Sequence, residues 1–390
     1  MFDQLGWLLV PVVAASGWWW ARRNLPAARS SGARWDVHYF EGLNYLLNEE
    51  QDKAVEVFIK MLEVNNDTVE IHLALGHLFR RRGEVDRAIR LHQNLSVRPH
   101  LNAQQRDHAV FELAQDYLSA GLLDRAEKLF VELKDSRYCG AQALGCLVDV
   151  YEREREWGAA IVAAREWERA SGVRRRGLIA QHLCELSDEA RASGDLASAL
   201  HSARQALREN KSSVRASLLI GDIEQTLGQP QRAIRAYLRI EKQNAGFIGE
   251  AIDPLMTCWT GIGELDSAHR FLLHLYERYG NYQALLAITR FFEQRHGEAQ
   301  VRKMLVDRLY AQPSVMGMQR LVELLMRHKN SASEDLSLVK QLLERLAEES
   351  IAYVCSHCGF GGKNLFWQCP GCRNWDSIQP RWAFQTAKGV

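Results

Sequence analysis

A pattern of large side chains, glycine and alanine recurs along most of this chain, and it restricts the fold more than any other feature. Two copies are Leu75-Gly76, Phe79, Gly83, Ala88 and Leu95, and Leu113-Ala114, Tyr117, Gly121, Ala126 and Phe130. Two later copies contain Gly221, Gly228, Ala233 and Tyr237, and Leu255, Trp259, Gly263, Ala268 and Leu272. The period is about 34 residues, which indicates an array of small structural repeats.

Pairs of antiparallel helices explain this pattern. The large residues fill the space between repeats, the alanine lets the second helix approach closely, and the glycine permits a positive φ angle at the turn. The pattern is that of the tetratricopeptide repeat, so we expect an all-α superhelix of about eight or nine repeats over residues 36–349. The usual role of its concave surface is to bind a peptide or protein, and we do not expect this fold to be catalytic.

The segment CSHCGFGGKNLFWQCPGC near the C-terminus contains two CxxC pairs. Each pair has a turn-forming glycine or proline, and such a loop directs two thiolates at one ion. We therefore expect Cys355, Cys358, Cys369 and Cys372 to bind one metal ion tetrahedrally, with zinc preferred over iron. Rubredoxins hold iron on similar loops, but Arg373 stands where their second glycine would be, and no partner redox motif is present.

Residues 351–390 are too few to build a core without help, so the metal is expected to stabilise this small rubredoxin-like or zinc-ribbon domain by about 10–16 kcal/mol. We expect its aromatic residues to form an apolar layer or a docking face on the last repeats: Phe360, Phe366, Trp367, Trp375 and Trp382. Zinc ribbons also bind nucleic acid, but the mild positive charge of this segment argues against nucleic acid as a partner.

Residues 1–21 are expected to form a transmembrane anchor. The uncharged residues 5–21 would span roughly 26 Å as a helix, just under a hydrocarbon core of roughly 30 Å. No lysine or arginine precedes this apolar run, which argues against a secretory signal. Tryptophans lie near both ends, and arginines follow at Arg22, Arg23, Arg29 and Arg34. The positive-inside rule then places the bulk of the chain in the cytoplasm, after a linker over residues 22–35.

Several other features of the sequence limit the possible functions. The charges nearly balance, with a formal net charge of +1, so there is no overall attraction to nucleic acid. The runs at residues 80–82 and 174–176 are interpreted as solvated arginines at helix ends, the alternative being sites for an acidic partner or lipid headgroups. The sequence contains no HExxH or GxSxG motif, so we expect no enzyme. The scattered cysteines are expected to be buried in a reducing compartment: Cys139, Cys146, Cys184 and Cys258.

Four parts of the chain together resemble the lipopolysaccharide assembly protein B family of Gram-negative bacteria. They are WWWARR, LNYLLNEEQDKAVEVFIKML, LGHLFRRRGEVDRAIRLHQNL and the terminal CxxCGF…WxCPxCxxW. The resemblance implies a single-pass inner-membrane protein with a periplasmic N-terminus, a cytoplasmic tetratricopeptide array and a rubredoxin-like domain whose metal ligands are the four cysteines. The glycine that Arg373 replaces is not needed in this family.

The same resemblance implies a non-enzymatic adaptor. Members of the family lower lipopolysaccharide synthesis by helping the membrane AAA+ protease FtsH degrade the lipid A deacetylase LpxC. The implied partners are therefore FtsH, LpxC, an inner-membrane lipopolysaccharide-sensing protein and membrane lipid. From the residues alone, two other functions stay open. A metal-dependent redox protein would contain iron and absorb visible light, and a membrane-tethered zinc ribbon would bind nucleic acid in a salt-dependent way.

Overall fold

The structure is a computed structural model that describes residues 41–42, 44–45, 50–64, 69–291, 293, 297–311, 313–327, 334–349 and 351–381. The predicted anchor (1–21), the predicted linker (22–35) and Trp382 lie outside these ranges, so they remain predictions. Within these ranges, no helix combines the length and apolar character that crossing a membrane requires.

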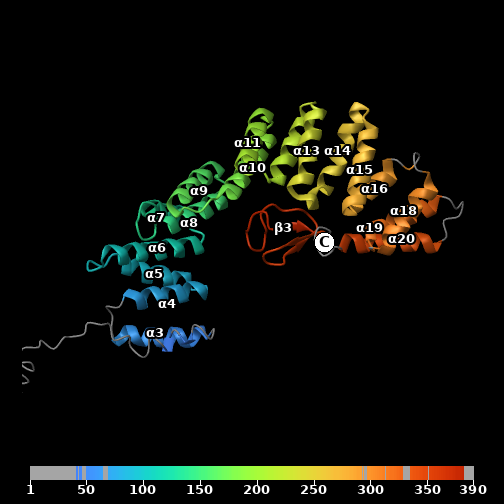
Figure 1. Cartoon of the computed structure of the whole chain (residues 1–390). Coiled ribbons are helices and arrows are strands. Elements are labelled where there is room, and N and C mark those ends of the chain that lie inside the picture. Colours follow the sequence, from blue (N-terminus) through green and yellow to red (C-terminus); the bar gives the residue numbers. More distant parts are fainter. Residues whose placement is uncertain are drawn as a thin grey trace, which may run out of the picture. The chain divides into compact units, whose positions relative to one another are not determined.

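The chain divides into two compact units, residues 1–143 and residues 144–390. The helices of the first unit are α3 (Gln51–Val64), α4 (Val69–Arg81), α5 (Val85–Ser96), α6 (Ala103–Ser119) and α7 (Leu123–Leu133). The boundary falls within α8 (Gly140–Glu154). The α4–α5 and α6–α7 pairs are helical hairpins of the kind that the repeat pattern predicts (Figure 1).

The second unit continues the same series of hairpins and ends in a small sheet. Its helices after α8 are α9 (Trp157–Ser171), α10 (Arg176–Ala192), α11 (Leu196–Glu209), α12 (Val214–Thr226), α13 (Pro230–Asn244), the 3₁₀ turn η1 (Ala245–Phe247), α14 (Gly249–Ile262), α15 (Leu265–Tyr279), α16 (Tyr282–Phe291), α18 (Glu298–Ala311), α19 (Val315–Arg327) and α20 (Glu334–Glu349). The strands are β1 (Tyr353–Cys355), β2 (Gly361–Gly362) and β3 (Ile378–Pro380).

The glycines and alanines of the repeat pattern have the roles that the sequence predicts. Gly263 ends α14 with φ 74°, a left-handed conformation that glycine adopts without strain. Ala233 and Ala268, on the second helices of their hairpins, are fully buried. Gly221 on α12 lies directly under the ring of Tyr237 on α13, where an added Cβ would clash with the ring. Glycine at this position therefore sets the distance between the two helices of the repeat.

The core of the second unit is continuous from α12 to α16. Its buried side chains include Tyr237, Phe247, Leu255 and Trp259. The phenol of Tyr237 is buried, and its hydroxyl group donates a hydrogen bond of 2.7 Å to Asp222 on the first helix of the same repeat. A buried hydroxyl group needs such a partner, so this bond accompanies the packing of the ring.

Arg80 and Arg175 both have partners in the structure, so the interpretation of the two runs as solvated helix ends is wrong for Arg80 and holds only in part for Arg175, which is half-buried. The side chain of Arg80 is 13% exposed and lies 2.6 Å from Asp116 and 2.5 Å from Glu112 on α6. The guanidinium group of Arg175 lies 3.6 Å from the centre of the Trp167 ring. Both cations therefore tie helices together within their own units.

Three of the scattered cysteines are buried, as predicted. They are Cys139, Cys184 and Cys258, while Cys146 is half-buried. Burial raises the pKa of Cys139 to about 11 and the pKa of Cys184 to about 12. The thiols therefore stay protonated at neutral pH, and a protonated thiol is a poor nucleophile.

Candidate metal centre and its docking surface

The C-terminal domain is built on a three-stranded antiparallel sheet in the order β2-β1-β3. The register pairs Tyr353 with both Gly362 and Pro380, and Cys355 with Ile378. These strands are short, and the buried core of the domain consists of Cys355, Cys369 and Ile378. So small a core agrees with the expectation that a metal ion stabilises the domain.

The two CxxC loops have the same backbone geometry. In the first loop, the amide of Gly359 donates to the carbonyl of Cys355 at 3.0 Å. In the second, the amide of Arg373 donates to the carbonyl of Cys369 at 2.8 Å. Gly359 and Arg373 have φ angles of 77° and 58°, so both residues that follow a CxxC pair are left-handed. The left-handed conformation is demanding for arginine, because of its Cβ atom.

The structure brings the four predicted cysteines together. All four sulfur atoms lie within 4.8 Å of one another. The Sγ atoms of Cys355 and Cys372 are 3.7 Å apart, and those of Cys358 and Cys369 are 3.6 Å apart. Four sulfurs at about 2.3 Å from one zinc ion in a tetrahedron are about 3.8 Å apart. The arrangement therefore fits a metal ion that four thiolates coordinate tetrahedrally, and both zinc and iron accept this coordination.

The surroundings of the sulfurs favour at least one thiolate. The hydroxyl group of Ser377 lies 3.3 Å from Sγ of Cys355, and this contact together with the backbone amides of Cys358 and His357 lowers the pKa of Cys355 to about 5. The backbone amide of Cys358 also points to that sulfur, at 3.5 Å. Neighbouring amides and hydroxyl groups stabilise a thiolate, which is the form that binds a metal ion.

Arg373 explains why the second loop lacks glycine. Its guanidinium group reaches α8 of the repeat array and lies 3.2 Å from Asp149 and 4.0 Å from Glu152. The left-handed backbone of this residue therefore directs a cation away from the metal loop and toward an acidic helix. The sequence marked Arg373 as a departure from the rubredoxin pattern, and the structure gives that departure a role in docking.

Glu152 is the main acceptor at one end of the interface between the domain and the repeats. Its Oε1 accepts from Nε1 of Trp375 at 2.9 Å, and its Oε2 accepts from Nε2 of Gln368 at 3.0 Å. His182 on α10 contacts the same Oε1 at 2.7 Å. The Trp375 ring packs edge-on against both Trp157 and His182. Trp375 is thus an aromatic anchor with a satisfied N–H group.

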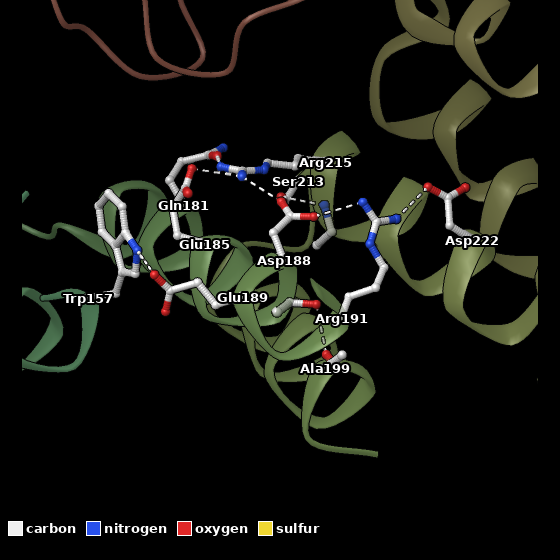
Figure 2. A network of polar contacts seen from close by, with 12 residues as sticks. Trp157, Gln181, Glu185, Asp188, Glu189, Arg191, Ala199, Ser213, Arg215 and Asp222 are labelled. Atoms are coloured by element: carbon white, nitrogen blue, oxygen red, sulfur yellow. Dashed lines mark hydrogen bonds and ion pairs between the residues drawn. The ribbon is translucent and has the colours of Figure 1, made fainter. Parts of the chain in front are cut away.

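A polar network continues the interface along α10 and α12 (Figure 2). Gln181 donates to Asp376 of the C-terminal domain at 2.6 Å and accepts from Arg215 at 3.2 Å. Arg215 also lies 2.8 Å from both Glu185 and Asp188. Burial raises the pKa of Asp376, although the contacts with Gln181 and Arg215 oppose this shift.

The other end of the interface lies at η1 and α14. The ring of Trp367 stacks on Phe247 with the centroids 5.8 Å apart. The hydroxyl group of Tyr353 donates to Glu250 at 2.8 Å, and burial raises the pKa of this carboxyl group. The domain therefore contacts α8, α10, α12 and α14, which are the first helices of four consecutive repeats.

The predicted docking face exists, but its place in the array differs from the prediction. Trp367 and Trp375 contact the repeats as expected, whereas they lie on the hairpins from α8 to α14 and not on the last repeats. Phe360 packs inside the C-terminal domain, and Phe366 is 40% exposed. The domain follows α20 in the sequence but packs against hairpins much earlier in the chain, and no local sequence signal encodes that contact.

The sequence alone did not predict the polar residues of the repeats that line the docking surface. Glu152, Gln181, Arg215 and Glu250 are all partly or fully buried polar residues on first helices. Each stands among residues of the apolar repeat pattern, where a buried polar side chain needs a partner. That conflict between position and polarity is the signal that could have found them.

Two family models match the chain. The model described as a rubredoxin metal binding domain matches residues 353–380, and the tetratricopeptide repeat model matches residues 184–246. The first match covers the whole four-cysteine loop system. The second begins within α10 and includes α11, α12 and α13, and Arg215 of the docking surface lies in it.

Curated relatives match nearly the whole chain. Lipopolysaccharide assembly protein B of Escherichia coli K12 is 33% identical over 380 residues, which are 97% of this chain and 98% of that protein. The protein of the same name from Haemophilus influenzae is 31% identical, with the same coverage of both chains. Among solved structures, the C-terminal part of a tetratricopeptide repeat protein from Cytophaga hutchinsonii covers 72% of this chain and 98% of its own, at 12% identity and a TM-score of 0.39.

Proposed function

Because the chain belongs to the lipopolysaccharide assembly protein B family, we propose that it is an inner-membrane adaptor that regulates lipopolysaccharide biosynthesis. In this proposal it promotes the degradation of the deacetylase LpxC by the membrane protease FtsH. An inner-membrane lipopolysaccharide-sensing protein restrains this effect. The observation that carries the proposal is the similarity to the E. coli relative over 97% of the chain.

The architecture supports an adaptor and gives a physical reason for the anchor. An array of helical hairpins offers a long surface for a polypeptide partner. A single-pass anchor over residues 1–21 would hold that surface beside a membrane protease with its N-terminus in the periplasm. Tethering both proteins to one membrane raises the effective concentration of the adaptor near the protease, so even weak contacts between them give binding.

The C-terminal domain has a structural role in this proposal. Cys355, Cys358, Cys369 and Cys372 would hold one zinc ion, and the ion would supply the folding free energy that the small core lacks. The folded domain then presents Trp367 to one repeat and Trp375 to others, which fixes the relative positions of the hairpins. An electron-transfer role would require iron in place of zinc, and metal analysis of the purified chain separates the two.

The test of the proposed function is the decay of LpxC in cells after translation is stopped. Cells without this protein should degrade LpxC several-fold more slowly than cells with it, and supplying the full chain should restore the fast decay. A chain without residues 1–21 should be made at normal levels and restore less, because the tether is lost. Equal decay with and without the full chain would contradict the adaptor role.

A further inference from the structure

A pocket of about 340 Å³ opens between the C-terminal domain and the first helices of three repeats. One wall consists of Leu365 and Trp367 of the C-terminal domain, and another of Leu218 on α12 and Pro254 on α14. We call it the composite pocket, because its walls come from two parts of the chain that docking brings together. Its volume is at the lower end for ligand pockets, about 300–1,000 Å³, and suits a single long side chain.

Acidic side chains line the composite pocket beside these apolar walls. Glu250 of α14 and Asp222 of α12 are both in its lining. Burial raises the pKa of each, although hydroxyl groups donate to them, from Tyr353 at 2.8 Å and from Tyr237 at 2.7 Å. A buried carboxylate with a raised pKa has given up hydration, and its hydrogen-bond donors compensate for this only in part. A cation bound beside it would stabilise the charged form.

The two arginines in the lining are already paired. Arg191 lies 3.1 Å from Asp188 and 3.3 Å from Asp222, so it bridges α10 and α12. Arg215 lies 2.8 Å from both Glu185 and Asp188. Figure 2 shows these groups side by side on the two helices. The lining of the composite pocket contains three carboxylates, those of Asp188, Asp222 and Glu250, and these two guanidinium groups, which leaves a formal charge of −1.

We propose that the composite pocket receives an arginine side chain of a polypeptide that the adaptor binds. The aliphatic stem would lie against Leu218, Leu365 and Trp367. The guanidinium group would pair with Glu250 and Asp222, for which its planar array of donors is suited. The excess of negative charge disfavours an anionic lipid headgroup as the occupant. The inference rests on the proposed function for the existence of a polypeptide partner, and it adds the chemistry of the contact.

The test uses two small probes on the purified, zinc-loaded full chain in detergent micelles. N-acetyl-arginine methylamide presents the stem and the cation, and N-acetyl-citrulline methylamide keeps the shape without the charge. Incorporated 5-fluorotryptophan reports binding by fluorine NMR, and Trp367→Phe identifies the Trp367 signal. The arginine probe should shift that signal saturably, with the citrulline probe binding at least about tenfold more weakly. If Trp367→Phe does not fold, calorimetric titration of the unaltered chain with both probes replaces the spectrum.

Two variants and a matched control locate the site. Glu250→Gln and Asp222→Asn should each weaken binding of the arginine probe by about five- to tenfold. Glu277→Gln changes an exposed carboxylate on α15 in the same unit, and it should leave binding unchanged. The inference is overturned if the probes bind equally, if both pocket variants bind like the unaltered chain, or if no shift occurs up to about 50 mM. Since the measurement is made on the purified chain, its failure is separate from an unchanged decay of LpxC in cells.

Discussion

Replacing Glu152 by glutamine tests whether one buried carboxylate holds the C-terminal domain to the repeats. The carboxylate accepts from Trp375 and Gln368 across the interface, at 2.9 and 3.0 Å. Its contact with His182 lies within the repeat array, so this contact persists when the domain undocks. Glutamine has the same shape, and the amide group of Gln368 can rotate to offer its oxygen to the new NH₂ group.

The expected cost follows from the charge of the acceptor. A hydrogen bond to a charged group contributes about 1.5–3 kcal/mol, and one to a neutral group about 0.5–1.5 kcal/mol. Two bonds that cross the interface therefore lose about 2 kcal/mol together. The 4.0 Å contact with Arg373 adds little, because the side chain of this arginine is 41% exposed. The population of the undocked state should rise about 30-fold.

The indole N–H proton of Trp375 reports this population directly. It is hydrogen-bonded in the docked state, so its exchange with deuterated solvent requires opening of the interface. In Glu152→Gln the exchange of this proton, followed by NMR at constant pH and temperature, should be about 30-fold faster than in the unaltered chain.

Asp149→Asn is the matched control on the same helix. It removes the 3.2 Å ion pair with Arg373, whose partners are 35% and 41% exposed, and such pairs contribute about 0–1 kcal/mol. Exchange should accelerate by no more than a few-fold. Equal acceleration in the two variants, or none in Glu152→Gln, would refute the assignment of the docking free energy to the buried carboxylate.

Three further predictions concern packing, pH and the metal. Gly221→Ala should lower the free energy of unfolding, measured in urea, by about 1–3 kcal/mol, because the added methyl group clashes with Tyr237. The control is Gly261→Ala on α14, also the first helix of a hairpin, where the added methyl group meets open space. It should raise the free energy of unfolding by about 0.5–1 kcal/mol. Desolvation raises the pKa of Asp376, so docking gains stability as the pH falls toward that raised value. Asp376→Asn, which is neutral and tolerates the φ of 53°, should raise the melting temperature near pH 7 by no more than about 1 °C, because the residue is partly screened by solvent, and should raise it less at lower pH. Cys369→Ser should reduce the bound zinc measured by mass spectrometry and abolish the protection of the indole N–H proton, without changing membrane insertion.

The repeat fold could be predicted in some detail because its signals are local. Gly263 and Ala268 stand at fixed distances within one hairpin, and the steric demands on them arise from residues of the same or the next helix. The four-cysteine cluster was predictable for the same reason, since two short loops with a fixed spacing are enough to bring four sulfurs together. Each of these features needs only short-range geometry.

The place where the domain docks on the repeats could not be predicted, although its aromatic docking face could, because the docking place depends on contacts between residues far apart in the sequence. Trp375 and Glu152 are 223 residues apart in the sequence, and nothing near either residue specifies the other. Arg80 shows the same limit, since an arginine in a run of three looks solvated until the acidic residues of α6 are in place beside it. Contacts with residues far apart in the sequence thus determine the environment of each charged side chain, whereas the neighbouring residues determine that it lies on a helix.

The contact of one small domain with four consecutive first helices has a consequence for how such a protein can evolve. Solenoids commonly gain or lose whole repeats, because each unit contacts only its neighbours. Between Asp149 and Glu250 a hairpin cannot be gained or lost in this way, because the C-terminal domain contacts both residues. An inserted hairpin would move Asp149 and Glu250 apart, and a deleted one would bring them together, while the domain that contacts both keeps its size. The number of repeats in this stretch should therefore be constant among relatives, and changes in array length should be confined to the hairpins on either side.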